Sequence, residues 1–255
     1  MQKIGLGIIL LLMMLTVPFI TMAKTELPSH VVNIEKQNNF TNVDEGESKV
    51  EPNKEVKNLL EDTDEQIENP VLIKLLNETS IKPTPFSFGY RGSVFLGRWP
   101  LSYKSKEKEI SWQFQKINQN ELNNVSGDKT GTLFYNQLEE KKVTGGLATK
   151  VDNPDQIKQL MLAKAREKGE LPMAFSYTLG KDTKLSNTYD VPVKKNGILS
   201  AYASAVNEKG EVRYGDVYVE LKGTKKNLEI KNVTTDKVAA WIVIPDHLSF
   251  SFELK

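Results

Sequence analysis

The last part of the chain alternates apolar and polar residues in the way that antiparallel β-strands do. Apolar side chains occupy every second position of residues 248–254, which is the period expected when one face of a strand is buried. Residues 238–244 are apolar throughout, which predicts a central strand that is covered on both faces. We therefore expect Trp241 and Phe250, which lie on these two strands, to be fully buried.

The same alternation predicts further strands and the turns between them. Strands are expected at 86–90, 94–99, 110–115, 132–138, 142–151, 198–206, 211–221 and 228–233. Asn196-Gly197 predicts a two-residue hairpin turn because both residues tolerate positive φ, and residues 207–210 and 222–224 predict two other turns. Gly145-Gly146 weakens the strand that contains it or marks a bulge.

Three helices are predicted from apolar stripes and from residues suited to helix ends. The first lies near residues 53–61. The second begins at Asn69-Pro70, where the asparagine caps free amide groups and the proline suits the first helical position. The principal helix spans residues 153–168, because Asn153-Pro154-Asp155-Gln156 supplies a cap, a first-turn proline, an acid and a capping-box glutamine.

This order of elements predicts an α+β protein that is predominantly antiparallel β-sheet, sandwich-like or curved, with one principal helix and short N-terminal helices. Residues 69–255 are expected to form one β-rich globular domain. Residues 24–68 contain a single aromatic residue, Phe40, and many polar ones, which predicts a loop-rich acidic arm.

Residues 1–23 have the order of a secretory signal peptide. Lys3 precedes an apolar run over residues 4–20, and a Thr-x-Ala ending follows. We expect cleavage between Ala23 and Lys24, which places the mature protein outside the cytoplasmic membrane. The alternative is an uncleaved anchor, since ~17 apolar residues reach the lower end of the range that spans a bilayer. The chain has no cysteine, which excludes a lipid attached through a thioether.

Charge is distributed unevenly along the chain. Residues 24–69 contain 12 acidic and 5 basic residues, whereas residues 70–255 contain 21 acidic and 28 basic ones. One interpretation is that the acidic part is a solvated arm. The other is that it lies against the cationic domain, or that this domain binds a polyanion.

Several segments are distinctive in combination, although none is a chemical signature. They are residues 28–34, 67–70, 73–81, 205–210, Gly97-Arg98-Trp99-Pro100-Leu101 and Asp246-His247-Leu248-Ser249-Phe250. With them the chain resembles the YfkD-like proteins of Bacillus-type bacteria along most of its mature length. The resemblance implies an exported protein of a Gram-positive bacterium, and it carries over no catalytic residue.

Histidine occurs only at His30 and His247, and Asp246-His247 with Ser249 suggests a nucleophile and its base. No strained Gly-x-Ser-x-Gly turn or oxyanion site accompanies them. We therefore expect these residues to be polar turn residues after Pro245 and not a catalytic set.

No metal or cofactor site is predicted, because the His-Glu-x-x-His and EF-hand patterns are absent. Paired carboxylates that would serve a glycosidase cannot be located, since their separation is a three-dimensional property. The aromatic residues that could line a sugar-binding face are expected to pack in the core instead. They are Phe86, Phe88, Tyr90, Trp99, Trp112 and Trp241.

Together these features favour an exported, monomeric, non-enzymatic binding protein of the cell envelope or wall. Its expected partner is an anionic wall polymer or an envelope protein, and not a nucleic acid. The alternatives are a wall-active hydrolase that uses buried carboxylates, and a structural protein of the envelope or spore tethered by its N-terminal segment. A deep acidic cleft would favour the hydrolase, and a flat sheet face with exposed aromatic side chains would favour binding.

Overall fold

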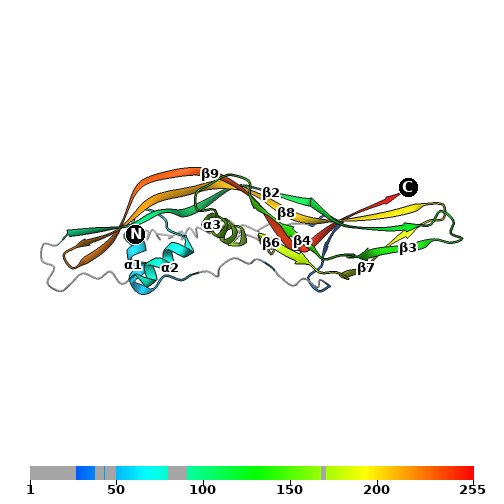
Figure 1. Cartoon of the computed structure of the whole chain (residues 1–255), viewed down its shortest axis with the longest axis horizontal. Coiled ribbons are helices and arrows are strands. Elements are labelled where there is room, and N and C mark those ends of the chain that lie inside the picture. Colours follow the sequence, from blue (N-terminus) through cyan, green and yellow to red (C-terminus); the bar gives the residue numbers. More distant parts are fainter. Residues whose placement is uncertain (1–26, 38–42, 44–49, 80–90, 168–170) are drawn as a thin grey trace, which may run out of the picture.

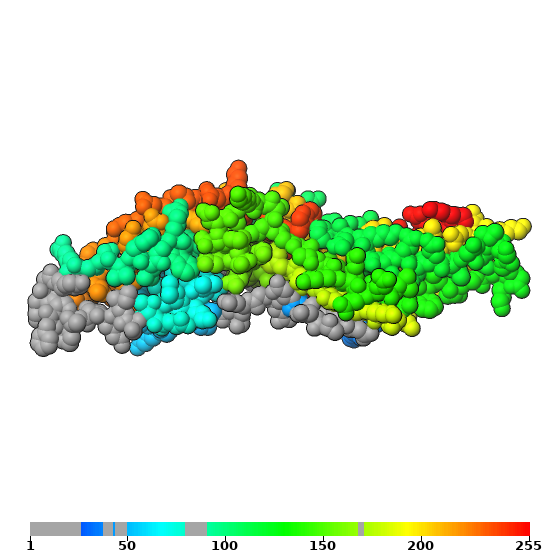
Figure 2. Space-filling view, viewed as in Figure 1, coloured from blue at the N-terminus to red at the C-terminus, as the bar shows by residue number. Residues whose placement is uncertain are grey.

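A long three-stranded antiparallel ribbon runs from one end of the molecule to the other (Figure 1). The computed structural model describes residues 27–37, 43, 50–79, 91–167 and 171–255. The ribbon consists of β2 (Arg91–Asn123), β8 (Asn196–Lys222) and β9 (Lys225–Leu254), with β8 in the middle. Figure 2 shows that the molecule is much longer than it is thick.

Shorter elements cover the ribbon. Two short strands, β1 (Val31–Asn33) and β5 (Gly146–Leu147), pair with β9. Two small sheets are formed by β3 (Gly131–Asn136) with β7 (Lys184–Val191) and by β4 (Lys141–Thr144) with β6 (Ser176–Leu179). The helices are α1 (Lys54–Glu61), α2 (Pro70–Glu78) and α3 (Pro154–Glu167). The expected strand-rich α+β fold with antiparallel sheets is confirmed.

One of the three predicted turns is present, and two are not. β8 and β9 form a hairpin through Gly223-Thr224, where Gly223 has φ 60°. Asn196-Gly197 is instead the start of β8, because Asn196 exchanges two 2.9 Å backbone hydrogen bonds with Lys255. The chain turns earlier, at Val193-Lys194, and β7 does not pair with β8.

The predicted turn at residues 207–210 is also wrong, because β8 continues straight through it. Asn207 lies opposite Glu109 on one side and Trp241 on the other, so both edges of the segment are paired. Gly210 allows this close approach: a Cβ at this position would lie 2.3 Å from the Lys104 carbonyl oxygen. The glycine therefore serves strand packing and not a turn.

Bulges allow strands that the sequence pattern divides to continue as one. Between Ala203 and Ser204 of β8, the partner on β9 changes from Leu248 to Ile244, so three residues of β9 bulge out. β2 bulges at the same level, between Ser111 and Gln115. An odd number of extra residues reverses the alternation of a strand. The three extra residues of β9 reverse its alternation of buried and exposed positions. The sequence pattern therefore predicted two strands where the structure has one.

Three apolar cores lie along the ribbon. The first joins the ribbon to β3, β4, β6 and β7, and the second joins it to α3. The third lies between the β8–β9 hairpin and the helices α1 and α2. Phe250 is buried in the first core as expected, with 6% of its surface exposed. Trp241 is only partly buried, so its predicted full burial is wrong; its ring packs against Phe114 at 5.1 Å.

The helix predictions are confirmed with one change in capping. Asn69 caps α2 by accepting hydrogen bonds from the amides of Val71 and Leu72. α3 begins after Asn153, whose φ of 54° is not that of a usual N-cap residue. Gln156, expected in a capping box, accepts a hydrogen bond from the Asn69 side chain at 2.9 Å instead. It therefore connects α3 to α2.

Carboxylates of the predicted acidic arm pair with cations of three different elements. Glu55 lies 3.0 Å from Lys226 on β9, Glu65 lies 2.7 Å from Arg213 on β8, and Glu68 lies 3.3 Å from Lys164 on α3. Apolar residues of the same segment are buried: Ile34, Val56, Leu59 and Ile67. The described part of residues 24–68 therefore lies against the rest of the chain. The expected domain boundaries at residues 23/24 and 68/69 stay a prediction.

Candidate functional site

The residues that the sequence singled out lie inside the sheet. Asp246, His247 and Ser249 are part of β9, with 7%, 4% and 0% of their surfaces exposed. They are not turn residues, because β1 pairs here, with Asn33 opposite His247. The residues of the predicted signal cleavage, Ala23 and Lys24, lie outside the described residues, as do Phe86, Phe88 and Tyr90.

These buried residues make few polar contacts with other side chains. His247 Nδ1 lies 2.6 Å from Asp246 Oδ1, and Asn33 donates a 3.4 Å hydrogen bond to the other carboxylate oxygen. Burial and then the Asp246 charge raise the pKa of Tyr177 well above its ordinary value. The Ser249 hydroxyl has no hydrogen-bond partner among the described residues, so it has no base. That the three residues are not catalytic stays a prediction.

One carboxylate, Glu208, is fully buried in the middle of β8. Its Oε1 accepts a 2.9 Å hydrogen bond from the Tyr103 hydroxyl on β2. Burial, followed by the charge of Glu208, raises the pKa of Tyr103 far above its ordinary value, so the phenol stays a donor. The residues opposite Glu208 are Lys108 and Ala240, so the strand pairing places no second carboxylate beside it.

The outer side of the β8–β9 hairpin carries a group of aromatic and charged side chains, which we call the hairpin face. Strand register places Phe95 of β2 beside Tyr218 of β8 and Glu229 of β9. The alternate residues of β8 at this end, Val217, Val219 and Leu221, are buried in the third core, so the opposite side faces outward. The hairpin face consists of Arg98, Phe95, Asp216, Tyr218, Glu220, Glu229 and Lys231.

An aromatic pair lies at the centre of the hairpin face. Phe95 is 55% exposed, and its ring centroid lies 4.9 Å from that of Tyr218. The ammonium of Lys231 lies 4.9 Å from the centroid of the Tyr218 ring, within reach of a cation–π interaction. Hydrogen bonding to Glu229 raises the pKa of Lys231, so this cation stays charged at neutral pH.

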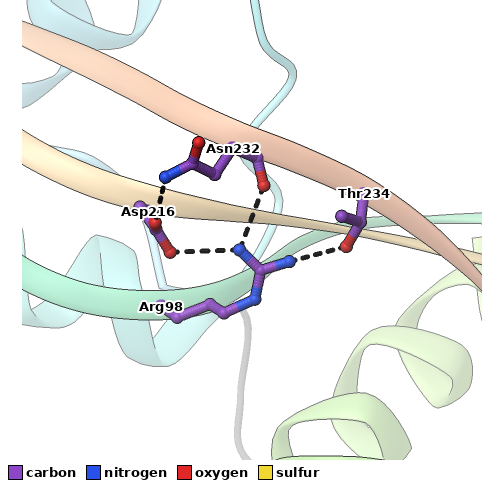
Figure 3. A network of polar contacts seen from close by, with 4 residues as sticks. All are labelled: Arg98, Asp216, Asn232 and Thr234. Atoms are coloured by element: carbon purple, nitrogen blue, oxygen red, sulfur yellow. Dashed lines mark hydrogen bonds and ion pairs between the residues drawn. The ribbon is translucent and has the colours of Figure 1, made fainter.

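Arg98 ties together all three strands at the border of the hairpin face (Figure 3). Its Nη1 donates 3.0 Å hydrogen bonds to Asp216 Oδ1 on β8 and to the Asn232 carbonyl on β9. Its Nη2 donates a 2.6 Å hydrogen bond to the Thr234 hydroxyl. Asn232 in turn donates to Asp216, and these hydrogen bonds hold the pKa of Asp216 below its usual value.

Backbone irregularities place these groups. β2 has an extra residue between Phe95 and Gly97, and Gly97 has φ 114°. Between Tyr214 and Asp216 of β8 the partner on β9 moves from Thr234 to Lys231, and Asn232 there has φ 51°. Because a bulge twists and redirects a strand, it aims side chains that a regular ladder would not. The bulges bring the Arg98 guanidinium within reach of β8 and β9.

Sequence reasoning missed Phe95 and Tyr218. The signal was available: the turn at residues 222–224 sets the register of β8 and β9, and alternation then places Tyr218 and Glu229 on one face. Trp99 was the least explained of the aromatic candidates. It is half-buried at the edge of the third core, and its Nε1 donates a 3.0 Å hydrogen bond to the Leu96 carbonyl. It therefore supports the bulge beneath the hairpin face.

No group of three or more His, Cys, Asp or Glu residues among the described residues is arranged to hold a metal ion. Within the same ranges, none of the helices is long and apolar enough to cross a membrane.

Residues 28–255 match the family model of the YfkD-like protein. The chain belongs to the YfkD-like family. A curated relative, Uncharacterized protein YfkD of Bacillus subtilis (strain 168), is 44% identical over 229 residues, which covers 90% of this chain and 87% of the relative. This confirms the resemblance seen in the sequence.

A comparison of folds returned the crystal structure of lamprey immune protein. It is 10% identical and has a TM-score of 0.28, with 64% of this chain and 53% of that chain covered.

Proposed function

We propose that this chain is an exported, monomeric, non-enzymatic binding protein of the bacterial cell envelope, and that the hairpin face binds an anionic wall polymer. Export is supported by the signal-like order of residues 1–23. Binding is supported by the hairpin face, and above all by one observation: Phe95 is 55% exposed on the sheet surface beside Tyr218.

The exposed Phe95 ring needs a reason, because apolar surface left in water costs free energy. Phe95 and Tyr218 offer ring faces on which a sugar or other flat unit of a polymer can lie. The hairpin face carries two cations, Arg98 and Lys231, and the three carboxylates Asp216, Glu220 and Glu229. The aromatic rings therefore supply the main contact, and Lys231 over the Tyr218 ring supplies the cation nearest to them. An extended polymer can lie along the strands over these two rings.

The acidic segment supplies a second reason to expect an anionic ligand. Glu55, Glu65 and Glu68 occupy three cations of the rest of the chain. Lys226, paired with Glu55, lies opposite Leu221 on the inner side of the same hairpin, across the sheet from the hairpin face. Surface charges attract a polyanion over about 8 Å at physiological ionic strength. A carboxylate behind the hairpin should therefore weaken binding on the outer side mainly at low ionic strength, where the screening length is longer.

The binding test compares two exposed phenylalanines by retention on purified wall material. Phe95→Ser removes the aromatic surface of the hairpin face, and Phe134→Ser removes a 47% exposed ring on β3 as a matched control. We expect Phe95→Ser to reduce retention severalfold and Phe134→Ser to leave it unchanged. Equal retention of all three proteins would refute the assignment to the hairpin face. Release of soluble sugar from the wall material would instead identify the hydrolase alternative.

A second test addresses the acidic segment. Deleting residues 24–68 would remove Val56, Leu59 and Ile67 from the third core, so a point change is the better probe. Glu55→Gln should raise retention at low salt, and added salt should abolish the gain. Glu35→Gln removes one charge from the same segment away from the hairpin and should have no effect. A gain with both variants would show that net charge alone decides.

Export has its own test. N-terminal sequencing of the protein recovered from outside the cytoplasmic membrane should begin at Lys24. A full-length, membrane-bound product would support the tethered alternative and contradict cleavage after Ala23.

A further inference from the structure

Two loops meet at one end of the ribbon, and the hairpin face lies near the other end. Residues 124–130 connect β2 to β3, and residues 192–195 connect β7 to β8. In Figure 1 they form the right-hand end, where the green and yellow parts of the chain lie together. We call these two loops the loop tip. β8 spans the distance between the loop tip and the hairpin turn with 27 residues, or roughly 90 Å of strand.

Asn124 joins the two loops into one surface. Its buried side chain donates hydrogen bonds to the Lys129 carbonyl at 3.0 Å and to the Val191 carbonyl at 2.8 Å. Its backbone amide donates to the Lys195 carbonyl, and its carbonyl accepts from the Lys194 amide, both at 2.9 Å. The loops are therefore held in place by hydrogen bonds made through one residue.

Backbone conformation also holds the loop tip in one shape. Lys194 has φ 63°, which an L-residue adopts only where its surroundings require it. Gly127 lies against Asn124, and a Cβ there would be 1.8 Å from the Asn124 side-chain oxygen. The exposed side chains of the loop tip are therefore attached to a backbone of fixed conformation.

Those side chains are aliphatic and cationic. Val125 is 54% exposed and Val193 is 39% exposed, one in each loop. Lys129, Lys194 and Lys195 are exposed around them, and Asp128 is the only acid of the two loops. None of the three lysines takes part in an ion pair of the described residues.

We propose that the loop tip docks on the surface of an anionic phospholipid bilayer. Exposed aliphatic side chains at the end of a narrow molecule can enter the boundary between headgroups and acyl chains, which favours apolar groups. Lysines of the same loops can stay at the headgroup level, where their long apolar stems lie along the membrane and their charges meet lipid phosphates. A hydrated polymer offers no such apolar layer to Val125 and Val193.

Docking at the loop tip is independent of the hairpin face. The two surfaces lie at opposite ends of β8, so both can be occupied together. A protein bound to lipid through the loop tip holds its hairpin face away from the membrane. The elongated shape then becomes a spacer between the bilayer and the wall.

The test measures the partition of purified exported protein into vesicles of phosphatidylglycerol and phosphatidylcholine at a ratio of about 3:7. We expect binding at low salt, weaker binding at high salt, and none to phosphatidylcholine alone. Each lysine near such a surface is worth about fivefold in affinity, so Lys194→Ser/Lys195→Ser should lower the partition coefficient roughly 25-fold. Val125→Ser/Val193→Ser should lower it at least fivefold with the charge unchanged.

Matched controls separate the loop tip from net charge and from misfolding. Lys225→Ser/Lys237→Ser removes two exposed lysines of β9 that are remote from the loop tip, and it should leave partition within twofold. Thermal unfolding of each variant, followed by circular dichroism, verifies that the fold is retained. Absence of binding to the anionic vesicles would overturn the proposal.

Two further results would also overturn it. The first is equal partition of the loop-tip and control variants. The second is self-association that Val125→Ser abolishes, seen by sedimentation without lipid, which would identify a second copy of the chain as the occupant.

Discussion

Arg98 on β2 and Asp216 on β8 form a 3.0 Å ion pair at the level where both outer strands carry an extra residue. The same guanidinium also reaches the Asn232 carbonyl and the Thr234 hydroxyl on β9. The bulges interrupt the backbone hydrogen bonds between neighbouring strands at this level, and Arg98 supplies side-chain hydrogen bonds between the same strands. The pair therefore holds the hairpin face to the rest of the ribbon.

Asp216 gives this arrangement a pH dependence. The hydrogen bonds from Asn232 and Arg98 hold its pKa below the ordinary value of 3.8 in the folded protein. A depressed carboxyl pKa stabilises the folded state above the unfolded pKa, and this contribution is lost as pH falls through the folded value. Asp216→Asn should therefore lower the urea midpoint at pH 7, and the difference from wild type should shrink as pH falls below the ordinary carboxyl pKa of 3.8. A difference that persists unchanged at acidic pH would contradict the ion pair.

Tyr103 and Glu208 provide a test of the buried middle of the ribbon. Tyr103→Phe removes the 2.9 Å hydrogen bond to the buried carboxylate, and an unsatisfied buried group costs about 1–3 kcal/mol. Tyr202→Phe is the matched control, because the Tyr202 hydroxyl makes no hydrogen bond to the described residues, and it should change stability little. Urea unfolding followed by fluorescence measures both. Equal effects of the two substitutions would show that the hydrogen bond contributes nothing.

Gly210 tests whether β8 is continuous. A Cβ at this position would meet the Lys104 carbonyl oxygen at 2.3 Å and the Tyr103 ring at 2.6 Å. Gly210→Ala should therefore destabilise the protein by about 1–3 kcal/mol, as overpacking does. Gly146→Ala places a Cβ that would have no atom within 4 Å and should change the free energy of unfolding by less than about 0.5 kcal/mol. Similar stability of both variants would contradict the continuous strand and support the turn predicted at residues 207–210.

Phe250 and Trp241 should differ in their contribution to the core. Phe250 is 6% exposed and meets the Tyr135 ring edge-on at 5.1 Å. Phe250→Ala should cost about 3–5 kcal/mol of unfolding free energy, the usual range for a buried phenylalanine. Trp241 is only half-buried, so Trp241→Ala should cost clearly less, measured by urea unfolding. A larger loss at Trp241 would mean that the exposed faces of β9 are assigned wrongly.

Local elements of this fold can be predicted from sequence, because their signals lie within a few residues of one another. Asn69-Pro70 marks the start of α2, and the helix stripe marks α3, since caps and periodicity are local properties. The turn at Gly223 is likewise local.

Continuous strands and the hairpin face required the structure. Glycine is common in turns, so the sequence places Gly210 in a turn. Only the strands on both sides of β8 show that this glycine is needed for close packing. Asp246 and His247 have polar side chains typical of turns, yet β1, more than 200 residues away in sequence, pairs over them. Phe95 and Tyr218 come together only through register and a bulge.

The most direct measurement of the central claim is hydrogen–deuterium exchange of the protein with and without soluble wall polymer. Binding at the hairpin face should slow exchange of amides in residues 94–98, 216–219 and 229–232, and leave residues 131–136 of β3 unchanged. High salt should weaken the protection, because Lys231 contributes charge to the contact. Protection that is absent, or that is confined to segments outside the hairpin, would contradict the account.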